Sequence, residues 1–273
     1  MKKASSHPFK TLKYGCFLLI ILFTTLINDR NASAQTQVFF DDFNGGSLNT
    51  KNWSIGTWNL GRTKLGNTPV FGTEPNTTYA RLTFDTYQFK GTEIYSVNSF
   101  ARGNGLEIEA RVRLNNLPSG LVTSLFTYTY DTSTATSDEI DIEILSKRVL
   151  QTFNGDPVLF TTWNNWSEAS PTYQDGTHHY SNEVLFPNFN VNGWHIYTIR
   201  WLPTGTEWLI DGQVVYSSSK ALPEAPTPVR LNFWAPASSW TDAYDPNLKQ
   251  VSRPKNNTRY YYDVDYVKVT QLP

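Results

Sequence analysis

The sequence of 273 residues contains almost no sulfur, because its single cysteine is Cys16 and its single methionine is Met1. Residues 35–273 therefore have no thiol, which excludes a disulfide framework, a cysteine nucleophile and a thiolate metal site there. The stability of this part of the chain has to come from a buried core, which a chain of this length can form without cross-links.

The sequence also lacks an excess of positive charge, with 23 Lys and Arg against 24 Asp and Glu. Five of the bases and one of the acids precede residue 35, so the remainder is net acidic. A nucleic-acid binder needs a basic face for phosphates, and we expect no nucleic-acid partner. Aromatic residues are abundant instead, at 15% with nine Trp, and their flat apolar faces suit stacking on sugar rings.

A hydrophobic run long enough to span a membrane is missing. The run at residues 16–27 has twelve residues, whereas a spanning helix needs about 20. It follows a basic stretch without acids and precedes Ala32-Ser33-Ala34, a small-residue cleavage signal. We predict a signal peptide over residues 1–34 and a single exported domain over residues 35–273, extracellular or periplasmic and free of the membrane after cleavage. An uncleaved anchor is the alternative.

Helix periodicity is absent after residue 35, and apolar residues alternate with polar ones. The ranges 106–114, 194–202 and 262–269 each show this period of two, which is typical of strands with one wet face. Asp211-Gly212 between two such runs predicts a hairpin turn. The fold class that we predict is all-β, a two-sheet antiparallel β-sandwich.

The most informative strand carries Glu139, Asp141 and Glu143 on one face and isoleucines on the other, because alternate residues of a strand share a face. Three carboxylates side by side repel, and no base lies among them. Retaining glycoside hydrolysis needs two carboxyl groups about 5–5.5 Å apart. On a concave sheet Glu139 and Glu143 would lean together with Asp141 between them, and crowding would raise the pKa of one of the two glutamates. A calcium-binding strand and a plain solvated strand face are the alternatives.

The segment Asp138–Leu145, DEIDIEIL, resembles the signature of glycoside hydrolase family 16, the jelly-roll β-glucanases. Further segments resemble parts of that family's fold in the same order along the chain. They are residues 39–48 with Trp53, residues 124–129, residues 194–215, residues 231–234 and residues 264–267. The resemblance implies a jelly roll with an open substrate cleft on its concave face.

By position, the resemblance implies that Glu139 is the nucleophile, Glu143 the acid/base and Asp141 a helper between them. The compact EIDIE resembles licheninases and xyloglucan-active members, which favours a glucan with β-1,3-1,4 or β-1,4 linkages. The expected protein is a secreted, endo-acting, retaining hydrolase of polysaccharide that forms a covalent glycosyl-enzyme. It is expected to be a monomer that requires no organic cofactor.

Several residues match cleft positions that hold sugars in the family: Asn232, Trp234, Phe126 and Tyr128, with Trp240 as a further match. An ordinary core position is the alternative for each aromatic.

The sequence also departs from the licheninase pattern. Tyr95 stands where those enzymes have a sugar-binding arginine, and Arg102 is the candidate replacement. After the catalytic strand, Trp163 and Trp166 replace a different segment and are candidates for a new sugar platform.

Asp265 matches a position at which family members bind a structural Ca²⁺, and a surface aspartate on a strand is the alternative. Two other functions stay open. The same site could pass the glycosyl group to a sugar as a transglycosylase, or the sandwich could bind carbohydrate without catalysis.

Overall fold

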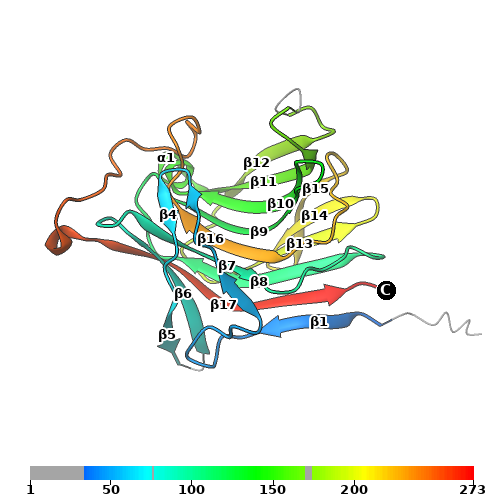
Figure 1. Ribbon diagram of the computed structural model, residues 1–273, viewed down its shortest axis with the longest axis horizontal. Helices are drawn as coiled ribbons and strands as arrows, with labels where there is room; N and C mark the ends of the chain where they lie inside the picture. The colour runs from blue at the N-terminus through cyan, green and yellow to red at the C-terminus, as the bar shows by residue number, and fades with distance from the viewer. Residues whose placement is uncertain (1–33, 76, 170–173) are drawn as a thin grey trace, which may run out of the picture. The chain divides into compact units, whose positions relative to one another are not determined.

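The computed structural model describes residues 34–75, 77–169 and 174–273. The predicted signal peptide, apart from Ala34, lies outside the described residues. These described residues form one compact unit that is almost entirely β-structure (Figure 1). Among the described residues, no helix is both long and apolar enough to cross a membrane.

The inner sheet has seven strands, and each is antiparallel to its neighbours. β10 lies near its middle, so that its side chains have neighbours on both sides. In spatial order the strands are β2 (Trp53–Ile55), β7 (Lys90–Ser96), β16 (Val229–Trp234), β9 (Val122–Asp131), β10 (Thr136–Leu145), β11 (Gly155–Trp166) and β12 (His179–Pro187).

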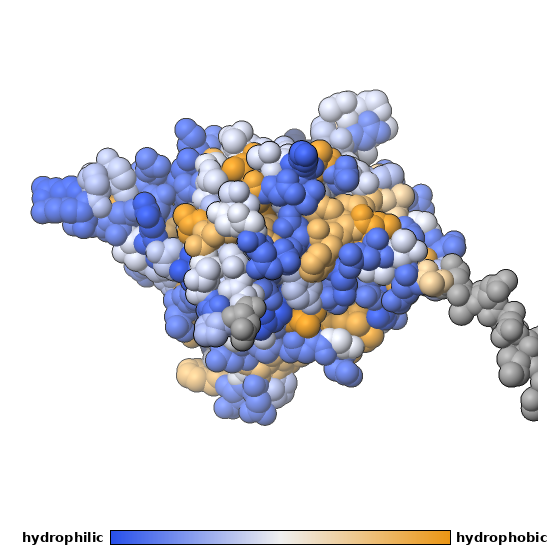
Figure 2. Space-filling model, turned by 90° about the horizontal axis from the view of Figure 1, so that it is seen from below, coloured by the Kyte–Doolittle hydropathy of each residue, from blue (hydrophilic) through white to orange (hydrophobic). Residues whose placement is uncertain are grey.

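The outer sheet packs behind it and is centred on β17 (Arg259–Gln271) and β8 (Leu106–Leu114). β1 (Thr36–Asp41) pairs with the end of β17, and β6 (Thr77–Asp85) pairs with its beginning. Hydrophilic residues cover much of the face seen from below in Figure 2. The sheet continues with β5 (Val70–Glu74) beyond β6, and with β13 (His195–Leu202), β14 (Gly205–Ile210) and β15 (Gln213–Ser218) beyond β8.

Short elements close the remaining gaps. The hairpin of β3 (Asn59–Leu60) and β4 (Thr63–Leu65) joins the start of β7 by a parallel pairing. The helices are α1 (Ser146–Gln151), which follows β10, and the 3₁₀ turn η1 (Pro254–Asn256). The predicted two-sheet antiparallel sandwich is therefore confirmed.

The core lies between the sheets and follows the alternation of the strands. In β8, the five apolar residues at even-numbered positions from Leu106 to Leu114 are all buried. In β10 the isoleucines at 140, 142 and 144 join the same core cluster, so the acids between them face the other way. Trp53, Trp201 and Trp208 are also fully buried, which makes these three tryptophans core residues and not sugar platforms.

Two local features differ in how well the sequence predicts them. The hairpin turn is confirmed, with positive φ at Asp211 (49°) and Gly212 (78°) as its tight geometry requires. The prediction that buried and exposed residues alternate without interruption over residues 262–269 is wrong, because the register of β17 against β8 shifts between Val264 and Tyr266. This β-bulge moves core-facing positions from even to odd residue numbers.

Candidate active site

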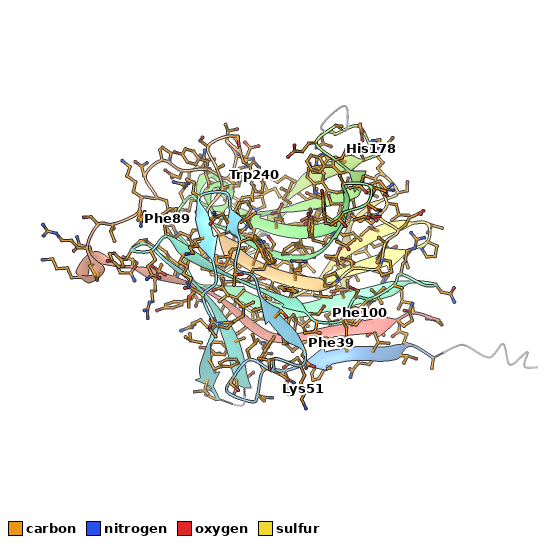
Figure 3. All side chains as sticks on the ribbon, in the orientation of Figure 1. Phe39, Lys51, Phe89, Phe100, His178 and Trp240 are labelled. Atoms are coloured by element: carbon orange, nitrogen blue, oxygen red, sulfur yellow. The ribbon has the colours of Figure 1, made fainter. Side chains whose placement is uncertain are left out.

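Glu139, Asp141 and Glu143 lie together on the concave face of the inner sheet. All three line a cavity of about 340 Å³ and also a second cavity of about 180 Å³. The strand β10 therefore places the three carboxyl groups between the two cavities. In Figure 3, Trp240 and His178 mark the rims on the two sides of this face.

The strands beside β10 place neutral side chains next to every acid. The two flanking strands are β9 and β11, and both pair with β10 in antiparallel register. None of the described residues forms an ion pair with any of the three acids. The cross-strand neighbours are Tyr128 and Trp163 for Glu139, Phe126 and Thr161 for Asp141, and Ser124 and Leu159 for Glu143.

This environment disfavours ionisation of all three carboxyl groups. Burial, followed by the charge of Glu143, raises the pKa of Glu139 to about 8. Burial raises the pKa of Glu143 to about 7, although Ser124 Oγ donates to Glu143 Oε1 at 3.4 Å. Burial and the two glutamates raise the pKa of Asp141 well above its usual range. The predicted rise therefore affects the whole row, and the row titrates as one coupled group.

A hydrogen bond within the row distinguishes the two glutamates. The bond between Asp141 and Glu139 lowers the pKa of Glu139 and raises that of Asp141. Asp141 therefore keeps its proton and donates a hydrogen bond to Glu139. This bond partly offsets the raised pKa of Glu139 and fits the predicted helper role of Asp141.

Trp163 contacts the acid row from β11. Its indole N–H donates to Asp141, which lowers the pKa of that carboxyl. The ring lies edge-on to Trp166 with centroids 5.2 Å apart, and 3.8 Å from the ring of His179. Burial lowers the pKa of His179 to about 4, so this histidine is neutral at pH 7. Trp163 also lines the smaller cavity, as a sugar platform requires.

The structure brings most of the predicted substrate-binding residues together. Phe126 and Tyr128 come from β9, and Asn232 and Trp234 come from β16, and all four line the larger cavity. Trp240 lines the smaller cavity and packs against Trp234 with ring centroids 5.9 Å apart. Asn232 is almost fully buried, and its Oδ1 has no hydrogen-bond partner in the described protein.

Tyr95 and Arg102 were predicted from the departures from the licheninase pattern, and neither lies at the predicted place. Tyr95 lines neither cavity itself and packs against Trp58, a residue that lines the larger one, with ring centroids 5.9 Å apart. The prediction for Arg102 is wrong. Its guanidinium lies over the ring of the buried Trp201 and donates to Pro223 O at 3.1 Å. Arg102 therefore lines neither cavity and cannot replace a sugar-binding arginine there.

Sequence reasoning missed Arg230, Glu93, Trp58, Leu60 and Ser124, which also line the larger cavity. Arg230 is the most consequential, because it introduces a positive charge. It lies two residues before Asn232 on β16, and the period of two places both on one face. This spacing from Asn232 was the sequence signal by which Arg230 could have been predicted to lie in the cleft.

The surroundings of Asp265 do not favour a metal ligand. Arg111 Nη1 donates to Asp265 Oδ2 at 2.6 Å, and Thr77 Oγ1 donates to the other oxygen. Its charge is thus balanced by a side chain, and no cluster of three His, Cys, Asp or Glu able to hold a metal occurs among the described residues. Calcium binding at Asp265 stays a prediction from the resemblance.

The comparisons with known proteins agree with this geometry. The family model described as "Glycosyl hydrolases family 16" matches residues 65–262. The chain is 29% identical to the beta-glucanase of Bacillus subtilis (strain 168) over 224 residues, which is 78% of this chain and 83% of that protein. It is 29% identical to the beta-glucanase of Bacillus licheniformis over 143 residues, and this match spans about half of each chain.

A solved structure of the Bacillus licheniformis beta-glucanase superposes with a TM-score of 0.62 at 25% identity. The superposition covers 86% of this chain and 98% of that one.

Proposed function

The chain belongs to the glycosyl hydrolases of family 16, and we propose that it is a secreted, endo-acting β-glucanase that retains the configuration of the anomeric carbon. The observation that carries this proposal is the buried row of Glu139, Asp141 and Glu143 between two cavities. Retaining hydrolysis requires two carboxyl groups at the scissile bond, one as nucleophile and one as acid and then base. The chain supplies both, so no organic cofactor is needed.

In the first step, the Glu139 carboxylate attacks the anomeric carbon and forms a covalent glycosyl ester. The glycosidic C–O bond breaks, and Glu143 gives its proton to the leaving oxygen. Asp141 keeps its own proton, and its hydrogen bond to Glu139 weakens as the charge on Glu139 is lost. In the second step, ionised Glu143 takes a proton from water, and the resulting hydroxyl displaces Glu139.

The two cavities supply the sugar sites on the two sides of the scissile bond. The larger one offers Trp234, Phe126 and Tyr128 as ring faces, and Asn232 as an amide that can read hydroxyl groups. The smaller one offers Trp163 and Trp240. Because sugars are held on both sides of the acids, cleavage within a polymer is favoured.

The shape of β10 supports a glucan that contains β-1,4 linkages, either mixed β-1,3-1,4 or β-1,4. β10 pairs with β9 without interruption from Thr136 to Leu145, so no bulge separates Asp141 from Glu143. The Bacillus relatives carry the name beta-glucanase, in agreement with this substrate class. Export rests on the predicted signal peptide, and the N-terminal residue of the secreted protein tests it.

A polysaccharide panel tests the proposal. Lichenan, barley glucan, xyloglucan, laminarin and agarose are digested, product linkages are determined, and the anomeric configuration of the first product is followed by NMR. We expect cleavage of lichenan and barley glucan with retention. Inversion, or cleavage of agarose alone, would contradict the proposal.

Two alanine variants test the roles of the glutamates. With added azide as an external nucleophile, Glu139→Ala should give the α-glycosyl azide and Glu143→Ala the β-glycosyl azide, because azide replaces the ester in one case and water in the other. Full activity in either variant would refute the assignment. Products that lengthen when an oligosaccharide acceptor is added would favour transglycosylation, and binding without any cleavage would favour a carbohydrate-binding sandwich.

A further inference from the structure

Arg230 occupies an unusual position in the cleft. In the described part of the chain, it is the one basic residue among those that line the two cavities. Its side chain is 13% exposed, so most of it is held inside the protein. A buried cation close to three catalytic carboxyl groups affects both substrate binding and the charge of the site.

The guanidinium of Arg230 is held from several sides. Its Nη1 donates to Glu93 Oε1 at 2.8 Å, and its Nε donates to the carbonyl oxygen of Tyr128 at 3.3 Å. The rings of Tyr95, Tyr128 and Trp58 lie 4.8, 5.3 and 5.7 Å from it. Such stacking on aromatic faces fixes the plane of a guanidinium.

This arrangement leaves donors for a ligand. A guanidinium has five N–H groups, and the two hydrogen bonds described use two of them. The carboxylate of Glu93 is 2% exposed and also accepts a hydrogen bond from Asn232, so it cannot turn away. The pair thus presents N–H groups to the cavity with its charge already balanced, which suits neutral hydroxyl groups better than an anionic substituent.

We propose that Arg230 is a specificity-determining residue of the cleft, which donates hydrogen bonds to the hydroxyl groups of an uncharged sugar in the larger cavity and places a positive charge near the nucleophile Glu139. This inference rests on the proposed function and deepens it. Arg230 is the direct cross-strand neighbour of Tyr95, so it brings a guanidinium to the place where sequence reasoning looked for one from Arg102.

The charge effect on Glu139 involves several elements. Arg230 lowers the pKa of Glu139, and Glu93 raises it. The nucleophile must be ionised, so kcat/KM falls when the pH drops through its pKa. This fall on the acidic side of the pH profile is the acid limb. The titratable and charged groups facing Glu139 are Asp141 and Glu143 on β10, Tyr128 on β9, Arg230 on β16, Glu93 on β7, and His179 of β12 behind Trp163.

The test uses pairs of variants that separate charge from hydrogen bonding. Arg230→Lys keeps the positive charge but loses the planar set of guanidinium N–H donors, so KM should rise about tenfold. The acid limb should stay at the same pH. Glu93→Gln should move the acid limb to lower pH. Adding Arg230→Met to Glu93→Gln should move it back to higher pH and raise KM. The double variant leaves no buried charge unpaired and therefore keeps the fold.

A rescue and a control complete the design. Tyr95→Arg added to the double variant should recover part of the KM loss, because it brings a guanidinium from the neighbouring strand. Arg200→Met on the outer sheet, where Arg200 pairs with Glu107 and Glu207, should change neither KM nor the acid limb.

The outcomes distinguish this inference from the proposed function. If the wild type cleaves glucan but the double variant matches Glu93→Gln in both KM and acid limb, the role of Arg230 is refuted and the function stands. If the wild type cleaves nothing, the function fails. Calorimetric binding of a mixed-linkage glucan tetrasaccharide to Glu143→Gln, with and without Arg230→Lys, then still decides whether Arg230 binds sugar.

Discussion

Both sheets carry buried acidic residues, and Asp263 on the outer sheet is neutralised differently from the acid row of β10 on the inner sheet. On the outer sheet, Asp263 is fully buried and accepts hydrogen bonds from Arg81 at 2.6 and 2.9 Å and from Arg113 at 2.8 Å. On the inner sheet, Glu139 and its two neighbours on β10 form no ion pair, and protons balance part of their charge. Asp263 is balanced by arginines, and the acid row of β10 is balanced by protons.

This difference indicates what each face is for. A carboxylate held by two arginines links three strands, which serves the fold. Carboxyl groups without a basic partner keep pKa values near neutrality, so they can gain and lose protons under ordinary conditions. The same residue type therefore acts structurally on β17 and chemically on β10.

Glu139→Gln gives the largest expected effect. It removes the nucleophile, so kcat on lichenan should fall by about 10⁴-fold or more. It also removes one buried charge that repels its neighbours, so the free energy of unfolding in urea should stay equal or rise by about 1 kcal/mol. A variant that lost both activity and stability would show that the row is part of the structural framework, like Asp263.

Asp263→Asn should show the opposite behaviour. It leaves Arg81 and Arg113 without their shared anion, so the free energy of unfolding should fall by about 3–5 kcal/mol. The site is on the other sheet, so kcat of the folded variant should stay within about twofold of the wild type. Glu107→Gln is the matched control, because Glu107 is a partly exposed partner of Arg200 and should cost at most about 1 kcal/mol. Equal losses in the two variants would contradict the comparison.

The pH dependence of stability should come from the inner face. Because the pKa values of Glu139 and Glu143 are raised to about 8 and 7, the folded state keeps protons that the unfolded state has lost. The free energy of unfolding should therefore fall as pH rises from 6.5 to 8, by at most about 1.4 kcal/mol per pH unit for each such group, and the slope should decrease as the pH passes the pKa of Glu143 and then that of Glu139.

Urea unfolding at several pH values measures this slope. The lowered pKa of His179, about 4, has the opposite sign, but it acts below pH 6.5 and stays outside this window. Glu139→Gln should flatten the slope between pH 6.5 and 8. An unchanged slope in that variant would assign the pH dependence to other groups.

Alternation along single strands predicted much of the fold and the acid row. β10 needs only its period of two to place acids on one face and isoleucines on the other. The bulge in β17 escaped prediction, because residues 262–269 alternate in composition and nothing local marks the extra residue.

The pairing between distant strands explains why Arg230 was missed and Arg102 was chosen wrongly. Arg102 follows Tyr95 closely in the sequence, but Arg230 opposes Tyr95 across two paired strands. Sequence order carries no direct information on which strands become neighbours, so a compensating residue on β16 could not be recognised from β7. In contrast, Asn232 and Trp234 were found through the resemblance, which already includes that topology.

Trp163→Phe gives the smallest expected effect and tests how the acid row on β10 is stabilised without an ion pair. The substitution removes the indole N–H that donates to Asp141 but keeps an aromatic ring at the smaller cavity. A single hydrogen bond of this kind contributes about 1 kcal/mol, so kcat/KM should fall about fivefold. Because the lost donor favoured ionised Asp141, that carboxyl should hold its proton more firmly, and KM should change less than kcat. Trp163→Ala removes the ring as well and should raise KM in addition. If Trp163→Phe left kcat and KM unchanged and only Trp163→Ala raised KM, Trp163 would contribute only a sugar-stacking surface, and the acid row would depend on burial alone.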